Sequence, residues 1–193
     1  MQHNVRRLVI DGGEPIVDFD NKAFKPIPQE GIDLAVSAMN AGVMYRYQPK
    51  KKEQSLTANL ERNFSKYMGV KHTIGTNSCG SAMYIALNIV GVEPGDKILT
   101  NAFTFHAVPS VIHHARAVPV LVESNREWAM DAEDLDRKAA ETGAKVLLMS
   151  YMRGHVPDMD AVMEVVEKHN LIFIEDCAHA YATLWNGQLL GTF

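Results

Sequence analysis

Cysteines, zinc-binding patterns and long apolar runs are scarce or missing in this sequence. Its 193 residues hold two cysteines, Cys79 and Cys177, far apart, so a disulfide scaffold is not expected and a reducing compartment is the default. No Cys/His spacing fits a zinc site. No stretch reaches the roughly 18 to 20 apolar residues that span a bilayer, and residues 1–15 lack the apolar segment of a signal peptide. We therefore expect a soluble, cytoplasmic protein without a metal or a membrane partner.

An excess of positive charge is also missing. The chain has 19 Lys and Arg against 23 Asp and Glu, a formal net charge of -4 at pH 7. This balance argues against a nucleic-acid partner, because a basic surface would be needed to neutralise phosphates. It does not exclude a small anion held by backbone amides. With 47% hydrophobic and 22% charged residues, the composition is typical of one soluble domain with a substantial core.

Candidate strands and helices alternate over most of the chain. This alternation predicts parallel strands with helices on both faces, an α/β three-layer sandwich. Two helices precede it, at 31–41 and from Ser55 to Gly69, and a hairpin with Asn-Gly at its turn follows it. The candidate strands are 72–76, 97–101, 117–123, 144–151 and 171–177, and the candidate helices are 81–91, 106–115, 131–142 and 157–170.

In such a sheet, ligands bind beyond the carboxyl ends of the strands. The first feature at such an end is TNSCGSA, residues 76–82, where small residues lead into a helix. Free amides at a helix N-terminus attract a phosphate, and Gly80 lets a ligand approach the backbone closely. The alternative is a plain strand–helix turn. The run matches neither GxGxxG nor GxxxxGK[ST], which weakens two nucleotide-binding interpretations.

Aromatic residues follow the next candidate strand, in NAFTFH, residues 101–106. Phe103 or Phe105 could present a ring face to a planar ligand, or both could belong to the core. The segment YMRGH, residues 151–155, follows another apolar strand. Arg153 could bind a carboxylate there, orient a loop, or lie on the surface.

The segment IEDCAHA, residues 174–180, places two carboxylates at the end of a strongly apolar strand. A buried carboxylate is costly unless it meets a cation or hydrogen-bond donors, so Asp176 needs a partner. A protonated pyridine nitrogen, a metal ion and a helix N-terminus would each serve. His179 lies three residues further on and could reach the same ligand, or it could be structural.

Taken in order, these segments resemble the DegT/DnrJ/EryC1/StrS family of sugar aminotransferases. The resemblance runs from about residue 27 to the end and implies a large domain of the fold-type I pyridoxal-phosphate transferases, incomplete at its C-terminus. We expect an N-terminal arm at 1–30 and a partial cofactor-binding domain at 31–193. The matching segments are NSCGSAM (77–83), GVEPGDKIL (91–99), AFTFHA (102–107), ARAVPVLVE (115–123), MDAEDL (130–135), GHVPDMD (154–160), IEDCAHA (174–180) and NGQLLGTF (186–193).

The resemblance also implies a role for six residues. Gly80, Ser81 and Ala82 would hold the phosphate of pyridoxal phosphate, through backbone groups and hydroxyls. Phe105 corresponds to the aromatic residue that stacks on the pyridine ring. Asp176 corresponds to the carboxylate that keeps the pyridine nitrogen protonated, so that the ring can act as an electron sink. His179 corresponds to the residue beside the phenolic oxygen of the cofactor.

The reaction implied by the family moves an amine from glutamate or glutamine to a keto sugar or keto cyclitol. A lysine forms the Schiff base with the cofactor and transfers the proton. In the family this lysine follows a GTFGD segment, and the chain ends at Phe193. We therefore assign no catalytic residue within the chain and expect the isolated chain, which also lacks the small C-terminal domain, to be inactive.

Three possibilities follow for the missing lysine. A second polypeptide supplies it in a split enzyme, the chain is an inactive truncated fragment, or it is a non-catalytic subunit that binds pyridoxal phosphate or a nucleotide sugar. The first is favoured, and a homo- or hetero-oligomer is expected because an unfinished sheet edge would be exposed. A dinucleotide-binding α/β domain is the competing class, and the missing glycine fingerprint counts against it. A phosphorylated response domain fits less well, since its acidic cluster would lie near the first strand.

Overall fold

The computed structural model describes residues 7–15, 26–42, 45–47 and 55–193. The chain divides into two compact units, Met1–Lys50 and Lys51–Phe193. In the first unit, a short 3-10 helix, η1 (Val9–Asp11), precedes helix α1 (Gln29–Ala41). Helix α1 follows Pro28 and ends at Gly42, whose φ of 66° gives the left-handed cap that glycine adopts readily. The predicted helix at 31–41 is confirmed.

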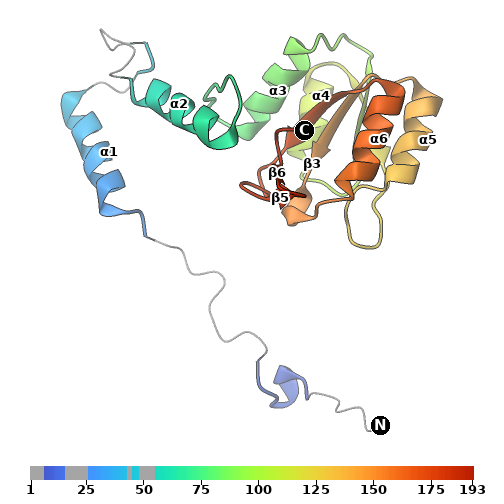
Figure 1. Ribbon diagram of the computed structural model, residues 1–193, viewed down its shortest axis with the longest axis horizontal. Coiled ribbons are helices and arrows are strands. Elements are labelled where there is room, and N and C mark those ends of the chain that lie inside the picture. Colours follow the sequence, from blue (N-terminus) through green and yellow to red (C-terminus); the bar gives the residue numbers. More distant parts are fainter. Residues whose placement is uncertain (1–6, 16–25, 43–44, 48–54) are drawn as a thin grey trace. The chain divides into compact units, whose positions relative to one another are not determined.

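The second unit is built on a four-stranded parallel sheet (Figure 1). Its strands lie in the order β2-β1-β3-β4. A helix, α2 (Leu56–Met68), precedes the sheet, and a two-stranded hairpin follows it. The strands are β1 (Lys97–Asn101), β2 (Val118–Val122), β3 (Val146–Ser150) and β4 (Ile172–Asp176), and the other helices are α3 (Cys79–Ile89), α4 (Ala107–His114), α5 (Ala132–Thr142) and α6 (Met159–His169).

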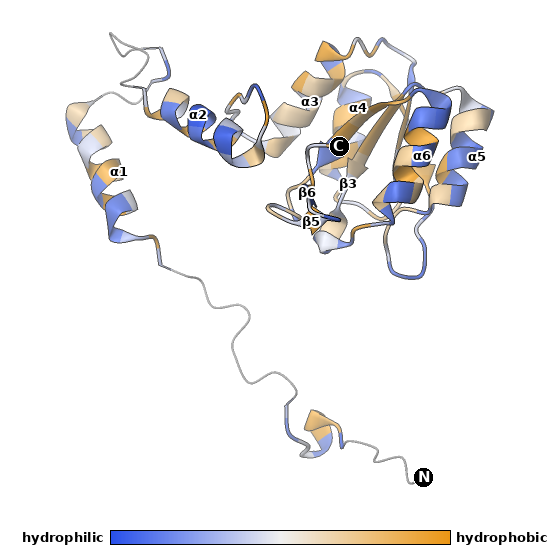
Figure 2. Cartoon of the chain, viewed as in Figure 1, coloured by the Kyte–Doolittle hydropathy of each residue, from blue (hydrophilic) through white to orange (hydrophobic). Residues whose placement is uncertain are grey.

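Two apolar clusters, one on each face of the sheet, hold helices against both faces and so give the second unit its three layers. Successive strand residues point to opposite faces. Leu99, Leu147 and Met149 accordingly pack with side chains of α5 and α6. Their strand neighbours, with Ile98 and Leu148 among them, pack with α3 and α4. Figure 2 shows apolar strands next to α5 and α6, whose outer faces carry hydrophilic residues. The α/β three-layer arrangement expected from the sequence is confirmed.

The candidate strand at 72–76 is wrong. Residues 72–76 form no strand, and side chains of α2 bind two of their polar groups, one of them a backbone N–H that a sheet partner would otherwise take. The Ser65 hydroxyl donates to Thr73 Oγ1 at 2.7 Å, and the Gly75 N–H donates to Glu61 Oε1 at 2.7 Å. The other predicted strands and helices lie within a few residues of their predicted bounds. Helix α3 begins earlier than predicted, at Cys79, with Ser78 as its N-cap.

The predicted Asn-Gly hairpin is present as β5 (Leu184–Trp185) and β6 (Gln188–Leu189). Asn186 and Gly187 both have positive φ, 47° and 88°, as a type I′ turn requires. The Trp185 indole N–H and the Asn186 amide each donate to the Asp160 carboxylate at 3.2 Å. The hairpin is thereby tied to the first turn of α6.

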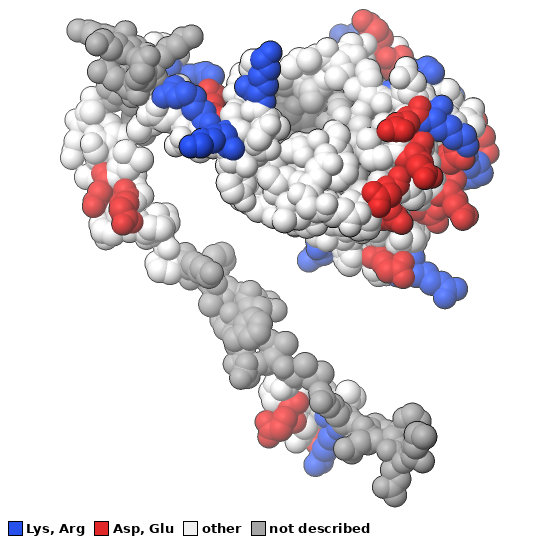
Figure 3. All heavy atoms as spheres, viewed as in Figure 1, with Lys and Arg blue, Asp and Glu red and all other residues white. Residues whose placement is uncertain are grey.

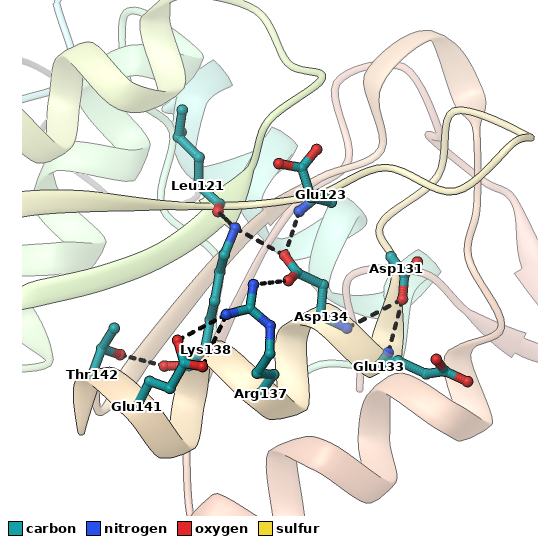
Figure 4. A network of polar contacts seen from close by, with 9 residues as sticks. All are labelled: Leu121, Glu123, Asp131, Glu133, Asp134, Arg137, Lys138, Glu141 and Thr142. Atoms are coloured by element: carbon teal, nitrogen blue, oxygen red, sulfur yellow. Dashed lines mark hydrogen bonds and ion pairs between the residues drawn. The ribbon is translucent and has the colours of Figure 1, made fainter.

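Charged side chains gather over α5 and α6 in the view of Figure 3. A polar network there fastens α5 to the end of β2 (Figure 4). Asp134 accepts the Glu123 N–H at 2.8 Å and pairs with Lys138 at 2.9 Å and with Arg137. Lys138 also donates to the carbonyl of Leu121. Burial alone would raise the pKa of Asp134, but the hydrogen bonds from Glu123, Lys138 and Arg137 outweigh it and lower that pKa from 3.8 to about 2.

Replacing Asp134 by Asn is expected to lower the free energy of unfolding by about 1 to 2 kcal/mol at neutral pH. A lowered folded-state pKa means that the stabilisation is complete above 3.8 and is lost as the pH falls toward about 2. The gap between wild type and variant should therefore stay constant from neutral pH to roughly pH 5 and then close. Urea unfolding across this range checks it, with Glu133→Gln as the control. A gap that does not change with pH contradicts the assignment.

Candidate functional site

A cavity of about 280 Å³ lies at the carboxyl ends of β1, β3 and β4, beside the N-terminus of α3. Four of the six residues singled out from the sequence line it: Gly80, Phe105, Asp176 and His179. They come from three segments that are far apart in the sequence. The whole lining consists of Cys79, Gly80, Met83, Phe105, Ala107, Ser150, Asp176, Ala178 and His179.

The other two predicted residues, Ser81 and Ala82, lie in the first turn of α3 and are not among the lining residues. Their amides are engaged by the N-cap. The Ser81 N–H donates to Ser78 Oγ at 3.1 Å, and the Ala82 N–H donates to the Ser78 carbonyl at 3.0 Å. Among the described residues, the amides of Cys79 and Gly80 have no acceptor, as expected for the first positions of a helix. The start of α3 thus keeps two free amides beside the cavity.

Asp176, the last residue of β4, brings a carboxylate to the cavity wall. The residue is 7% exposed, and its Oδ1 accepts the Ala178 N–H at 3.1 Å. The Cys79 thiol also donates to Oδ1, at 3.4 Å. Burial raises the pKa of the Cys79 thiol from 9.0 to about 11, and the charge of Asp176 adds to this, so the thiol is a neutral donor near pH 7. Within the part of the chain that the structure describes, both side-chain hydrogen bonds of Asp176 end on Oδ1, which leaves Oδ2 for another donor.

The ring of His179 is oriented by the backbone of the turn after β3. The Arg153 N–H donates to His179 Nδ1 at 3.1 Å, so the neutral ring carries its proton on Nε2. Arg153 has a φ of 55°, in the left-handed region that non-glycine residues seldom adopt. A Cβ on the neighbouring Gly154 would lie 3.3 Å from the His179 carbonyl oxygen. Of the three options for Arg153, the structure favours the surface position for its exposed side chain, and only its main-chain N–H contacts His179.

The two phenylalanines after β1, which sequence reasoning could not separate, have different surroundings. Phe105 lines the cavity, is 51% exposed and has its ring 4.3 Å from that of His106, so it is not a core residue. Phe103 instead packs its ring against Trp128, with 5.2 Å between centroids. It lines a separate, open hollow with residues 123–126. Phe105 is therefore the phenylalanine that can face a planar ligand in the cavity.

Sequence reasoning missed Cys79 as a side chain of the site. Its signal was present, because it stands inside the TNSCGSA turn and just before Gly80. The described residues hold no group of three or more His, Cys, Asp or Glu arranged to bind a metal ion. No helix in the described ranges is long and apolar enough to cross a membrane.

The groups around the cavity fit pyridoxal phosphate. Two free amides at a helix N-terminus suit a phosphate, an exposed ring suits the face of a pyridine, and a buried carboxylate suits its protonated nitrogen. The parallel α/β unit has the architecture of the large domain of fold-type I pyridoxal-phosphate transferases.

The family can be named from the sequence match. The model of the DegT/DnrJ/EryC1/StrS aminotransferase family matches residues 48–193, and the chain belongs to that family. The resemblance inferred from the sequence is thereby confirmed.

Two relatives illustrate the match. The spore coat polysaccharide biosynthesis protein SpsC of Bacillus subtilis is 32% identical over 134 residues, which cover 69% of this chain and 34% of that protein. The putative L-glutamine:3-amino-2,3-dideoxy-scyllo-inosose aminotransferase of Micromonospora echinospora is 27% identical over 191 residues, or 97% of this chain and 44% of that protein.

Solved structures agree with this assignment. The putative sugar aminotransferase Spr1654 of Streptococcus pneumoniae, in its PLP form, is 29% identical with a TM-score of 0.76, covering 86% of this chain and 45% of that one. DesV of S. venezuelae, solved in complex with a ketimine intermediate, is 26% identical with a TM-score of 0.75, covering 86% and 43%. The chain thus spans less than half the length of each of these proteins.

Proposed function

We propose that this chain supplies the cofactor-binding part of a pyridoxal-phosphate-dependent aminotransferase. The reaction transfers an amine from glutamate or glutamine to a keto sugar or keto cyclitol. The observation that carries the proposal is the cavity that unites Gly80, Phe105, Asp176 and His179. Membership of the family supports the reaction type. The relative named for L-glutamine and a scyllo-inosose derivative supports the donor and the class of acceptor.

In this proposal each group of the cavity has one task. Asp176 accepts a hydrogen bond from the pyridine N–H through Oδ2 and keeps that nitrogen protonated. Phe105 packs against the ring face, and His179 donates from Nε2 to the phenolic oxygen. The start of α3 holds the phosphate through the free amides of Cys79 and Gly80, whereas the amides of Ser81 and Ala82, also predicted for this role, bond to the N-cap Ser78. When bound, the cofactor supplies a protonated ring that withdraws electrons from the carbon bearing the amine.

No lysine lines the described cavity. We therefore assign the proton-transferring lysine to a segment outside residues 1–193, and we favour a second polypeptide as its source. Cytoplasmic location, an oligomeric assembly, and the division into an arm at 1–30 and a partial large domain at 31–193 remain predictions. A non-catalytic subunit that binds pyridoxal phosphate or a nucleotide sugar is the alternative, as is an inactive truncated fragment.

Spectroscopic titration with pyridoxal phosphate and pyridoxamine phosphate tests the proposal. The chain alone should bind both without a borohydride-reducible lysine adduct at the site and without turnover. Adding the product of a neighbouring gene that carries an S-F…K segment should produce both adduct and turnover. A reduced lysine adduct with turnover from the chain alone would contradict the split site. Failure to bind either cofactor would contradict the cofactor role, and binding without turnover in the completed assembly would favour the non-catalytic alternative.

A further inference from the structure

Asp176 is held by donors from two distant parts of the chain. The Cys79 thiol, at the first position of α3, and the Ala178 N–H, just after β4, both donate to Oδ1. The two partners of the thiol contact are 97 positions apart in the sequence. Two donors on one oxygen fix both the position of the carboxylate and the rotation of its plane. Because both bonds end on Oδ1, Oδ2 is the oxygen left to meet a ligand in the cavity.

Cys79 fits neither a core position nor the role of a nucleophile. A core thiol would be enclosed, whereas Cys79 is exposed and lines the cavity. A nucleophilic cysteine needs a thiolate, which positive neighbours stabilise. Partial burial of the thiol raises its pKa, and the neighbouring carboxylate raises it further, to about 11. The thiol therefore remains a hydrogen-bond donor across the neutral range.

We propose that Cys79 is a positioning residue for Asp176: its S–H holds Oδ1 so that Oδ2 faces the cationic ring nitrogen of the cofactor. This inference rests on the proposed cofactor site and deepens it. It assigns a role to a side chain that makes no contact with the reacting atoms itself. Two measurements test it, one on the contact and one on its consequence for binding.

The contact is tested without cofactor, by the rate at which iodoacetamide alkylates Cys79 in a Cys177→Ala background, where it is the sole thiol. Adding Asp176→Asn removes the charge that disfavours the thiolate. The pKa of the thiol should then fall part of the way from about 11, because its partial burial, the largest cause of the shift, remains. At a fixed pH below 9, the alkylation rate should therefore rise by about threefold to tenfold. A rate that Asp176→Asn leaves unchanged would overturn the contact.

The effect of the Cys79–Asp176 contact on cofactor binding is tested by titrating the chain with pyridoxamine phosphate. Cys79→Ala should weaken binding by about fivefold to tenfold, and Cys79→Ser, which keeps a donor, should stay within about twofold of wild type. Thr142→Ala, which removes a hydroxyl bonded to the Lys138 carbonyl on α5, is the matched control and should bind as wild type does. With ¹⁵N-labelled cofactor, the ring nitrogen should be less protonated in Cys79→Ala than in wild type, an effect that general loosening of the fold would not produce.

The measurements distinguish a failure of the proposed cofactor site from a failure of the positioning role of Cys79. If wild type does not bind pyridoxamine phosphate, the proposed function is wrong, and the alkylation rates still judge the contact. If wild type binds and Cys79→Ala matches it in affinity and in the ring-nitrogen signal, the positioning role is wrong while the cofactor site stands. If Cys79→Ser is as weak as Cys79→Ala, the donor itself is not what matters, and the inference is overturned.

Discussion

Asp176→Asn is expected to weaken the binding of pyridoxamine phosphate to this chain by about 10- to 100-fold. A hydrogen bond to a charged group contributes roughly 1.5 to 3 kcal/mol, which corresponds to this range. The Asn side chain is the same size, and its oxygen can still accept from Ala178 and Cys79. Its amide group would then stand where Oδ2 stands and would point a donor at the N–H of the ring. The loss therefore combines a missing charge with two donors that face each other.

Titration followed by cofactor absorbance checks this result, and urea unfolding checks the fold. The free energy of unfolding should change by less than about 1 kcal/mol, because both hydrogen bonds of Oδ1 can persist. Glu164→Gln, an exposed carboxylate on α6, is the control for a simple loss of negative charge. Equal affinities for Asp176→Asn and wild type would contradict the role given to Asp176. Equal losses for Asp176→Asn and Glu164→Gln would reduce the effect to long-range charge.

Most of the sheet could be predicted because its strands are short apolar runs separated by amphipathic helices. The run VLLMS, residues 146–150, is wholly buried, and the leucines and valines of the flanking helices fall on the faces that pack against it. The prediction of a strand at 72–76 was wrong for a specific reason. Its residues suit a strand, but Thr73 and Gly75 are bound by side chains of α2, and a local pattern carries no information about such long-range partners.

The candidate site could be predicted in kind but not in detail. Asp176 was found because a carboxylate at the end of a buried strand needs a partner. The choice between Phe103 and Phe105 depends on a contact with Trp128, which lies far along the chain. The orientation of His179 depends on a backbone N–H of Arg153, a group that is the same in every non-proline residue. Residue types therefore identified the chemistry, and only the fold shows how the side chains are held.

The carboxylate next to Asp176 serves the fold. Glu175 Oε1 accepts the hydroxyl of buried Tyr151 at 2.6 Å and the Gly191 N–H at 2.8 Å. Glu175 Oε2 accepts the Phe193 N–H at 3.1 Å. Burial raises the pKa of Tyr151, and the hydrogen bond to Glu175 raises it further, so the phenol remains a donor. One side chain thus joins β3, β4 and the segment after the hairpin.

Glu175→Ala is expected to lower the free energy of unfolding by about 2 to 4 kcal/mol, since it leaves the buried Tyr151 hydroxyl with only the weak thioether acceptor of Met159, at 3.4 Å, and frees two backbone amides. Tyr151→Phe should cost less, about 1 kcal/mol, because it removes the donor together with its need for a partner. In the double variant the two losses should not add, and the shortfall measures their coupling. Urea unfolding gives these energies, hydrogen exchange should speed up at Gly191 and Phe193 in Glu175→Ala, and Glu164→Ala is the exposed control. Additive losses, or unchanged exchange at those two amides, would show that Glu175 does not join these segments.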